Sequence, residues 1–196
     1  MFDIFVPSQE EPVAFTIRRD YYPALRESGT RKLSVIEWCV LHDMESTNLT
    51  GAAEGTGAWF QNHQVQASTH YGIDNNSIQQ YLNLTTIPWG APGANLNGIH
   101  YEQMGKASWT REQWFDKAKP TLDRTAWLLA KNHRRLEAAN VHVPLQRLTD
   151  NEIRSHKHGI TTHRQLTRAL GIGTHTDPGS GYPLDWVIQR ARHYAG

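Results

Sequence analysis

The residues of this chain that could do metal chemistry gather towards its carboxyl end. His163 closes the segment Gly-Ile-Thr-Thr-His, and Asp177 follows after a basic segment, within Thr-Asp-Pro-Gly. His175 lies two residues before that carboxylate. A zinc ion binds histidine nitrogen and carboxylate oxygen, and a hydrolytic zinc site uses three protein ligands with the fourth position open to water. His163 and Asp177 therefore supply two candidate ligands, and a third must come from elsewhere.

The third candidate ligand is His42, which follows the apolar run Val-Ile-Glu-Trp-Cys-Val-Leu at 35–41. A histidine at the carboxyl end of a buried strand places its ring at the rim of a sheet, where binding and catalytic sites collect. Taken alone, each of the three residues could be an ordinary polar residue beside a cleft. Taken together, they predict a zinc site assembled from distant parts of the chain.

Four segments, in this order, resemble the zinc-dependent N-acetylmuramoyl-L-alanine amidases. That family includes phage lysins and bacterial muropeptide amidases, and it shares its fold with peptidoglycan recognition proteins. Three of the segments are the strand that ends in His42, the Gly-Ile-Thr-Thr-His motif and the Thr-Asp-Pro-Gly motif. The fourth, residues 95–105, resembles the family's Asn-containing strand, which carries an inward glutamate three residues before a glycine. The resemblance runs from about Val35 to Trp186.

The resemblance implies a reaction and a cofactor. It assigns His42, His163 and Asp177 as ligands of one Zn²⁺ ion, which would activate water and polarise the scissile carbonyl. The implied reaction is hydrolysis of the amide bond between N-acetylmuramic acid and L-alanine in peptidoglycan, carried out by a phage lysin. Two alternatives stay open: a binding module that uses the same cleft without hydrolysis, and a zinc peptidase that acts on another amide bond of the wall.

Two further residues are predicted to be catalytic. Glu102 aligns with the inward glutamate of the family strand, where a carboxylate can act as general base; the alternative is a surface glutamate in a salt bridge. His175 stands where many relatives carry a lysine, and it could stabilise the oxyanion of the tetrahedral intermediate. Since histidine titrates near neutral pH, this replacement should make activity sensitive to pH. The alternative is an ordinary surface histidine.

Three residues are predicted to bind substrate. His100 lies two residues from Glu102, so both share one strand face and His100 should be near the same cleft. His70 could contact substrate or support a metal ligand. Trp89 could stack on a sugar face or fill the core. Many relatives carry Trp-His-Ala-Gly at this point, so Gly90 replaces a histidine of the cleft.

Composition argues against other classes of partner. The 196-residue chain has 20 basic and 19 acidic side chains and a formal net charge of +1, which gives no indication of nucleic-acid or membrane binding. No stretch approaches the roughly 20 apolar residues of a membrane span. The single cysteine, Cys39, cannot form an internal disulfide and fits a small buried residue. We expect a monomer whose partner is the peptidoglycan substrate.

The first residues, Met-Phe-Asp-Ile-Phe-Val-Pro, lack the basic start and apolar run of a signal peptide. We therefore expect the chain to be made in the cytoplasm and delivered to the bacterial cell wall by a separate agent, as a phage lysin is by a membrane pore.

Strand and helix patterns alternate, which predicts an α/β domain with a mixed central sheet flanked by helices. The resemblance adds a zinc cleft on one face. We expect residues 1–32 to form an N-terminal arm packed on a catalytic domain at 33–196. Strands are predicted at 33–41, 67–74 and 78–82. Helices are predicted at 51–62, at 110–136, after Thr149, and from Pro183 onwards; Pro120 should kink the second of these or split it in two.

Overall fold

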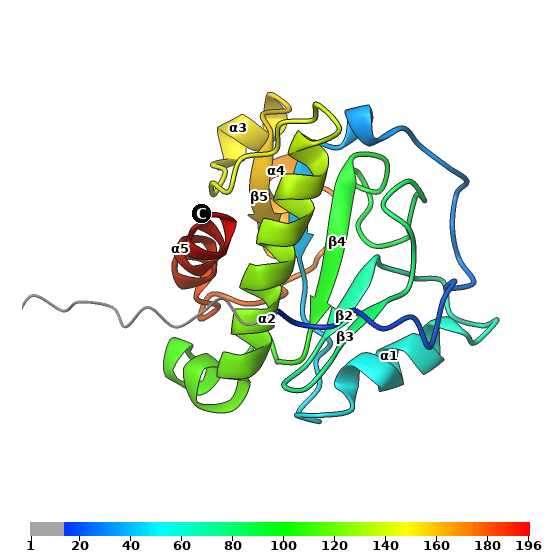
Figure 1. Cartoon of the computed structure of the whole chain (residues 1–196), viewed down its shortest axis with the longest axis vertical. Coiled ribbons are helices and arrows are strands. Elements are labelled where there is room, and N and C mark those ends of the chain that lie inside the picture. Colours follow the sequence, from blue (N-terminus) through cyan, green and yellow to red (C-terminus); the bar gives the residue numbers. More distant parts are fainter. Residues whose placement is uncertain (1–13) are drawn as a thin grey trace, which may run out of the picture.

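A computed structural model describes residues 14–196, and a five-stranded mixed sheet lies at its centre (Figure 1). The strand order is β3-β2-β4-β1-β5. Strand β2 pairs with β3 antiparallel, and the other neighbouring strands pair in parallel. The strands are β1 (Trp38–Leu41), β2 (Tyr71–Ile73), β3 (Ile78–Gln80), β4 (Gly98–Gln103) and β5 (Gly159–Thr162). This is the mixed α/β sheet that the sequence predicted.

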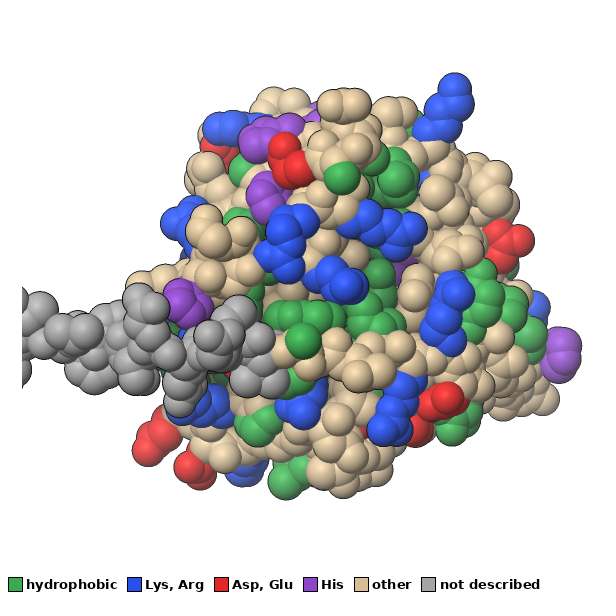
Figure 2. All heavy atoms as spheres, viewed as in Figure 1, with side chains coloured by type: hydrophobic (Ala, Val, Ile, Leu, Met, Phe, Trp, Pro, Cys, Tyr) green, Lys and Arg blue, Asp and Glu red, His purple; other side chains and the backbone are tan. Residues whose placement is uncertain are grey.

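Helices cover both faces of the sheet. They are α1 (Ala52–Phe60), α2 (Arg111–Glu137), α3 (Asp150–Arg154), α4 (His163–Leu170) and α5 (Leu184–Ala195). Because side chains alternate along a strand, Cys39 and Leu41 of β1 face the core beneath α2 and α5, whereas Trp38 and Val40 face α3 and α4. Helix α2 crosses the sheet as a separate layer, and Lys and Arg side chains are spread over this side of the molecule (Figures 1 and 2).

The long helix α2 begins as the sequence predicts. The Thr110 side chain accepts from the N–H of Gln113, whose side chain accepts from the N–H of Thr110, so both halves of a capping box are present. Pro120 has no N–H to donate, and the helix departs from helical geometry at Ala118, with φ −127° and ψ 16°. The predicted kink is therefore confirmed, two residues before the proline.

The strands are shorter than predicted. Residues 33–35 form a 3-10 turn, η1 (Leu33–Val35), so only the second half of the predicted strand 33–41 pairs in the sheet. Val35 is 38% exposed and is not held by the core, whereas Trp38 to Leu41 are all buried. The predicted strand 67–74 likewise narrows to Tyr71–Ile73. These corrections move strand starts and leave the carboxyl end of β1, where His42 follows, in place.

Part of the predicted N-terminal arm can be traced. Within residues 14–32, the N–H of Arg18 donates to the Ile78 carbonyl of β3, and the N–H of Ala24 donates to the Tyr81 carbonyl just after it. The segment then continues along residues 85–87, where the N–H of Arg31 donates to the Thr85 carbonyl. Residues 1–13 of the predicted arm, including the first seven residues, which lack signal-peptide features, lie outside the described residues. Within residues 14–196, none of the helices combines the length and apolar character needed to cross a bilayer.

Gly72 on β2 gives a stability prediction. A Cβ at this position would lie 1.7 Å from the hydroxyl oxygen of Tyr81, which is fully buried and donates a hydrogen bond to the Ala53 carbonyl of α1. We expect Gly72→Ala to lower the free energy of unfolding by about 1–3 kcal/mol through overpacking, measured by urea denaturation. Gly55 in α1 has open space around it. The control Gly55→Ala should be neutral or stabilising by up to about 1 kcal/mol, and equal losses in both variants would contradict the overpacking argument.

Candidate active site

The sheet register brings three of the predicted residues to one edge. Leu41 of β1 pairs with Tyr101 of β4 and with Thr162 of β5. The residue that follows each of these three is His42, Glu102 or His163. Since all three strands run in parallel, their carboxyl ends meet at the same edge of the sheet, which is where α/β folds place their ligand sites. Segments from distant parts of the sequence therefore converge here.

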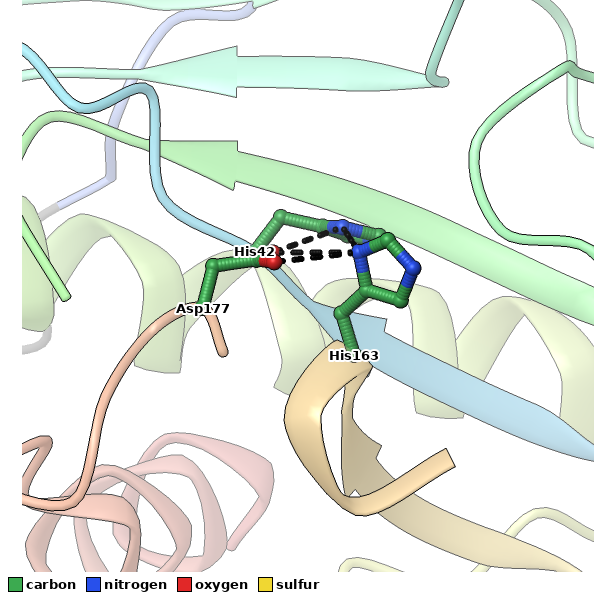
Figure 3. Close-up of side chains that lie close together, drawn as sticks. All are labelled: His42, His163 and Asp177. Carbon is green, nitrogen blue, oxygen red and sulfur yellow. Dashed lines mark hydrogen bonds and ion pairs between the residues drawn. The ribbon is translucent and has the colours of Figure 1, made fainter. Parts of the chain in front are cut away.

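The predicted metal ligands lie together at this edge (Figure 3). The Nδ1 atoms of His42 and His163 are 3.1 Å apart. Asp177 places Oδ2 3.2 Å from each of these nitrogens. One ligand atom from each residue falls within 4.8 Å of the others, a cluster that could hold a metal ion. Both histidines are buried and the aspartate is half-buried.

Local structure holds Asp177 in the loop between α4 and α5. Its backbone carbonyl accepts from the N–H of Arg164 at 2.8 Å, which ties the loop to the first turn of α4. Gly179 has a φ of +88° and packs on Ala107, whose carbonyl oxygen would lie 2.0 Å from an added Cβ. Only glycine fits both conditions. The Pro-Gly that follows Asp177 therefore seats the loop against the domain.

Charge favours a cation between these side chains. Burial acts to raise the pKa of the Asp177 carboxyl, but the neighbouring His163 and His42 imidazoles outweigh it and hold that pKa well below its usual range. Burial also lowers the pKa of His42, an effect that the neighbouring Asp177 carboxylate only partly offsets. The site therefore offers an ionised carboxylate beside a neutral imidazole, which are the protonation states that metal ligands require.

His175 lies at the mouth of the same site. Its ring stacks on that of His163, with centroids 3.8 Å apart and 22° between the planes, and its side chain is half exposed. Burial and the neighbouring His163 lower the pKa of the His175 imidazole. At neutral pH the side chain is therefore a neutral donor rather than a cation, and this distinguishes it from the lysine that it was compared with.

A cleft of about 740 Å³ opens in front of these residues, a size typical of ligand pockets. The three candidate ligands line it, together with Thr56, Trp59, Thr69, Trp89, Glu102 and His175. Trp89 is therefore placed where a substrate contact was predicted. Trp59 was missed as a site residue. It lies on α1 and is 52% exposed, an exposure that its helical spacing in the sequence does not reveal.

Glu102 lies deep in the cleft. Its Oε2 is buried and no described residue donates a hydrogen bond to it. Burial, followed by the negative charges of Asp177 and Asp43, raises the pKa of the Glu102 carboxyl well above its ordinary value. The structure thus shows no salt bridge at this glutamate within the described residues, contrary to the alternative considered from sequence.

Asp43 is a second buried carboxyl of the cleft, which sequence reasoning passed over as loop. Its Oδ1 accepts from the N–H of Glu45 at 2.8 Å, while Oδ2 is buried without a partner among the described residues. Burial raises the pKa of Asp43 to about 7.

The structure does not bring His70 or His100 to the substrate side of the cleft, which corrects their prediction as substrate contacts. Both are completely buried. His70 Nδ1 accepts from the backbone N–H of His100 at 3.0 Å, and His70 Nε2 lies 3.2 Å from the Thr86 carbonyl. His100 Nδ1 lies 2.9 Å from Nε2 of His42. His100 on β4 and His70, which immediately precedes β2, thus place their rings behind the candidate metal ligand, not in front of it.

Arg31 completes this buried polar group and was not predicted. Its Nη2 lies 3.0 Å from His70 Nε2, and its other nitrogens donate to the carbonyls of Leu84, Asn95 and Leu96. Burial lowers the pKa of His100 well below its ordinary value, with the neighbouring His42 and His70 adding to the effect. His100 is therefore a neutral imidazole.

Cys39 takes no part in the site. It is buried on the opposite face of β1, with Sγ 3.6 Å from the Tyr101 hydroxyl, and burial raises the pKa of its thiol to about 11. The prediction of a small buried residue is confirmed.

Comparison with known proteins identifies a family and agrees with the fold. A family model described as N-acetylmuramoyl-L-alanine amidase matches residues 32–180. A search of curated proteins finds no match. Among solved structures, the hydrolase AmiA of Staphylococcus aureus is 17% identical, with 93% of this chain and 84% of that chain covered and a TM-score of 0.71.

Two further structures share the fold at low identity. A mutant endolysin from Bacillus subtilis is 15% identical over 93% of this chain and 100% of its own, with a TM-score of 0.58. The N-acetylmuramoyl-L-alanine amidase LysC from Clostridium intestinale is 11% identical over 91% of this chain and 99% of its own, with a TM-score of 0.54.

Proposed function

This chain belongs to the N-acetylmuramoyl-L-alanine amidase family, and from that premise we propose that His42, His163 and Asp177 hold the zinc ion of its reaction. The enzyme hydrolyses the amide bond between N-acetylmuramic acid and L-alanine in peptidoglycan, so its site of action is the cell wall. The observation that carries the zinc proposal is the mutual spacing of the three candidate ligand atoms.

That spacing fits zinc. Ligands about 2.0–2.2 Å from a tetrahedral ion stand roughly 3.3–3.6 Å apart, and a modest closing of the ligand–metal–ligand angles brings this to just over 3 Å. The two imidazole nitrogens and the carboxylate oxygen are separated by 3.1, 3.2 and 3.2 Å. Two neutral nitrogen donors and one anionic oxygen donor are also a ligand set common in catalytic zinc sites. A zinc ion there would supply a Lewis acid that polarises the scissile carbonyl and makes water a nucleophile at neutral pH.

We assign proton transfer to Glu102. Its carboxyl group faces the cleft in the strand position next to His42, and its raised pKa brings it towards the pH at which a group both takes and returns a proton efficiently. As a carboxylate it accepts a proton from the attacking water. As the carboxylic acid it then delivers that proton to the nitrogen of L-alanine as the amide C–N bond breaks.

We assign stabilisation of the oxyanion to His175. Its imidazole is half exposed at the cleft and fixed by stacking on His163. As a neutral donor it can place an N–H towards the developing negative charge. Protonation at lower pH would replace a neutral donor with a cation, so this role makes the activity depend on pH.

We propose that Trp59 and Trp89 contact the substrate. Both line the cleft, and the Trp89 indole is oriented by a hydrogen bond from Nε1 to the Ser28 hydroxyl at 2.7 Å. An indole held in this way offers a flat apolar face with its polar edge satisfied, which suits stacking on a sugar ring. The exposed indole of Trp59 offers a second such face from α1.

Analysis of digested wall tests the bond that is opened. We expect the metal-loaded enzyme to release stem peptides with a free L-alanine amino terminus and glycan strands that keep intact N-acetylmuramic acid, identified by mass spectrometry. Amino termini at another stem residue would instead indicate a peptidase. Binding without any released peptide would indicate a non-catalytic module. A chelator-treated sample is the control, since the proposed chemistry needs the metal.

Two expectations from sequence remain proposals. We propose that the enzyme works as a phage lysin and reaches the cell wall with the help of a separate release agent. Its fold is shared with the Bacillus subtilis endolysin. We also propose that it acts as a monomer, because the cleft is built from one chain with residues of β1, β4, β5 and the loop after α4.

A further inference from the structure

We infer that His100 is a positioning residue that fixes the tautomer of His42 and leaves His42 Nδ1 as a lone-pair atom at the metal site. The inference rests on the proposed role of His42 as a ligand. A histidine binds metal through an unprotonated nitrogen, and the hydrogen bond made by its other nitrogen selects the tautomer. Here that partner is a second histidine, buried behind the first.

The tautomers follow from one backbone carbonyl. His100 Nε2 lies 3.2 Å from the Ala94 carbonyl oxygen, which can only accept, so the proton of the neutral His100 ring belongs on Nε2. His100 Nδ1 is then an acceptor. It lies 2.9 Å from His42 Nε2, which must therefore carry the proton of His42. This leaves His42 Nδ1 unprotonated, and it is Nδ1 that faces His163 and Asp177.

The opposite arrangement conflicts with the surroundings. If His42 carried its proton on Nδ1, His100 would have to donate from its own Nδ1, and its bare Nε2 would face the Ala94 oxygen. Two lone pairs would then oppose each other in a buried place. The Asp177 carboxylate does not require the His42 proton, because His163 Nδ1 also lies 3.2 Å from it and can donate.

The fold makes a slot for the His100 ring. A Cβ on Gly90 would lie 2.8 Å from His100 Nδ1, and a Cβ on Gly98 would lie 2.7 Å from His100 Nε2. Each of the two His100 ring nitrogens that make the tautomer-selecting hydrogen bonds is thus packed against a glycine, which has no side chain. His70 holds the backbone of His100 from behind. Gly90 stands where many relatives carry a cleft histidine, and the imidazole of His100 occupies the space beside it.

Nitrogen-15 NMR on the full-length, chelator-treated protein tests the tautomer without relying on activity. We expect His42 to show a protonated Nε2 and an unprotonated Nδ1. In His100→Leu, which removes the acceptor but fills the slot, His42 should lose this single form and become a mixture of tautomers. In His100→Asn the amide oxygen can still accept near the position of Nδ1, so the wild-type form should be retained.

Zinc affinity measured by chelator competition gives the second readout. We expect His100→Leu to weaken zinc binding by about 10–100-fold, the range for loss of a partner behind a ligand. His100→Asn should stay within a few-fold of the wild type. Gly90→Ala should weaken binding by crowding the His100 ring, and it should cost nothing further in a His100→Ala background, where that ring is absent. Affinities are compared per folded molecule, from NMR of the same samples.

The outcomes separate this inference from the proposed function. A proton on Nδ1 of His42 in the wild type, or equal zinc affinity in His100→Leu and His100→Asn, would overturn the positioning role even though His42 remained a ligand. If His42→Ala keeps its zinc, the ligand assignment fails, and the inference fails with it whatever tautomer the NMR spectrum reports.

Discussion

Replacing His163 with alanine will remove bound zinc and amidase activity together. His163 supplies one corner of a triangle whose sides are 3.1 to 3.2 Å, and its ring also supports the stacked ring of His175. Loss of a direct ligand should weaken zinc binding by more than the roughly 100-fold upper figure for loss of an outer partner. His42→Ala should have the same effect, because the remaining two ligands cannot close the site.

Metal analysis of the purified variants and release of stem peptides from wall are the two measurements. His193→Ala is the matched control, since it removes an exposed histidine of α5 that lies outside the cleft. A full zinc complement in both His163→Ala and His42→Ala would show that the ion, if any, binds elsewhere. Loss in the His193→Ala control as well would point to a general effect of removing histidines and not to this site.

Two of the three candidate ligands could be located from the sequence because their positions follow from strand ends. His42 and His163 each come directly after a short apolar strand, and parallel pairing in register places the ends of such strands side by side. Glu102 lies beside His42 because β4 pairs with β1 in the same way, on the side of β1 opposite to β5. Asp177 is different, since no periodicity places a loop residue, and only its motif connected it with the site.

For His70 and His100, the sequence predicted the direction of the side chains correctly but not how deeply they are buried. His70 and His100 do lie on the face of the sheet that carries His42, as alternation along the strands requires. Whether an inward side chain reaches the cleft or stops behind another ring depends on what packs in front of it. The His100 ring can be buried because Gly90 and Gly98, which pack against it, have no side chains.

Trp59 shows a complementary difficulty. Its spacing along α1 matches that of buried Ala52, Ala53 and Phe60, so helical periodicity alone does not single it out as a site residue. Helix α1 lies over β2 and β3, and its cleft-facing side keeps Trp59 uncovered. Periodicity identifies the direction of a side chain on a helix but does not tell whether a neighbour covers it.

Glu102→Gln will keep zinc and lose most turnover. Glutamine preserves the shape of the side chain but cannot take a proton from water, and loss of a general acid or base typically lowers the rate by about 10²–10⁴-fold. We expect kcat to fall in that range with zinc content unchanged. Thermal stability should stay equal or rise, because Oε2 is buried without a partner within the described residues, so the charged form is costly to keep.

Asp43→Asn is the comparison that makes this prediction specific. Asp43 lines the same cleft, is buried, and has a pKa raised to about 7, and its Oδ2 has no partner within residues 14–196. Burial and titration alone therefore do not distinguish the two carboxyls. Position does. Asp43 is held in a turn by the N–H of Glu45, whereas Glu102 shares a strand face with the ring behind His42. We therefore expect Asp43→Asn to cost far less in kcat than Glu102→Gln; the reverse order would transfer the role of the base to Asp43.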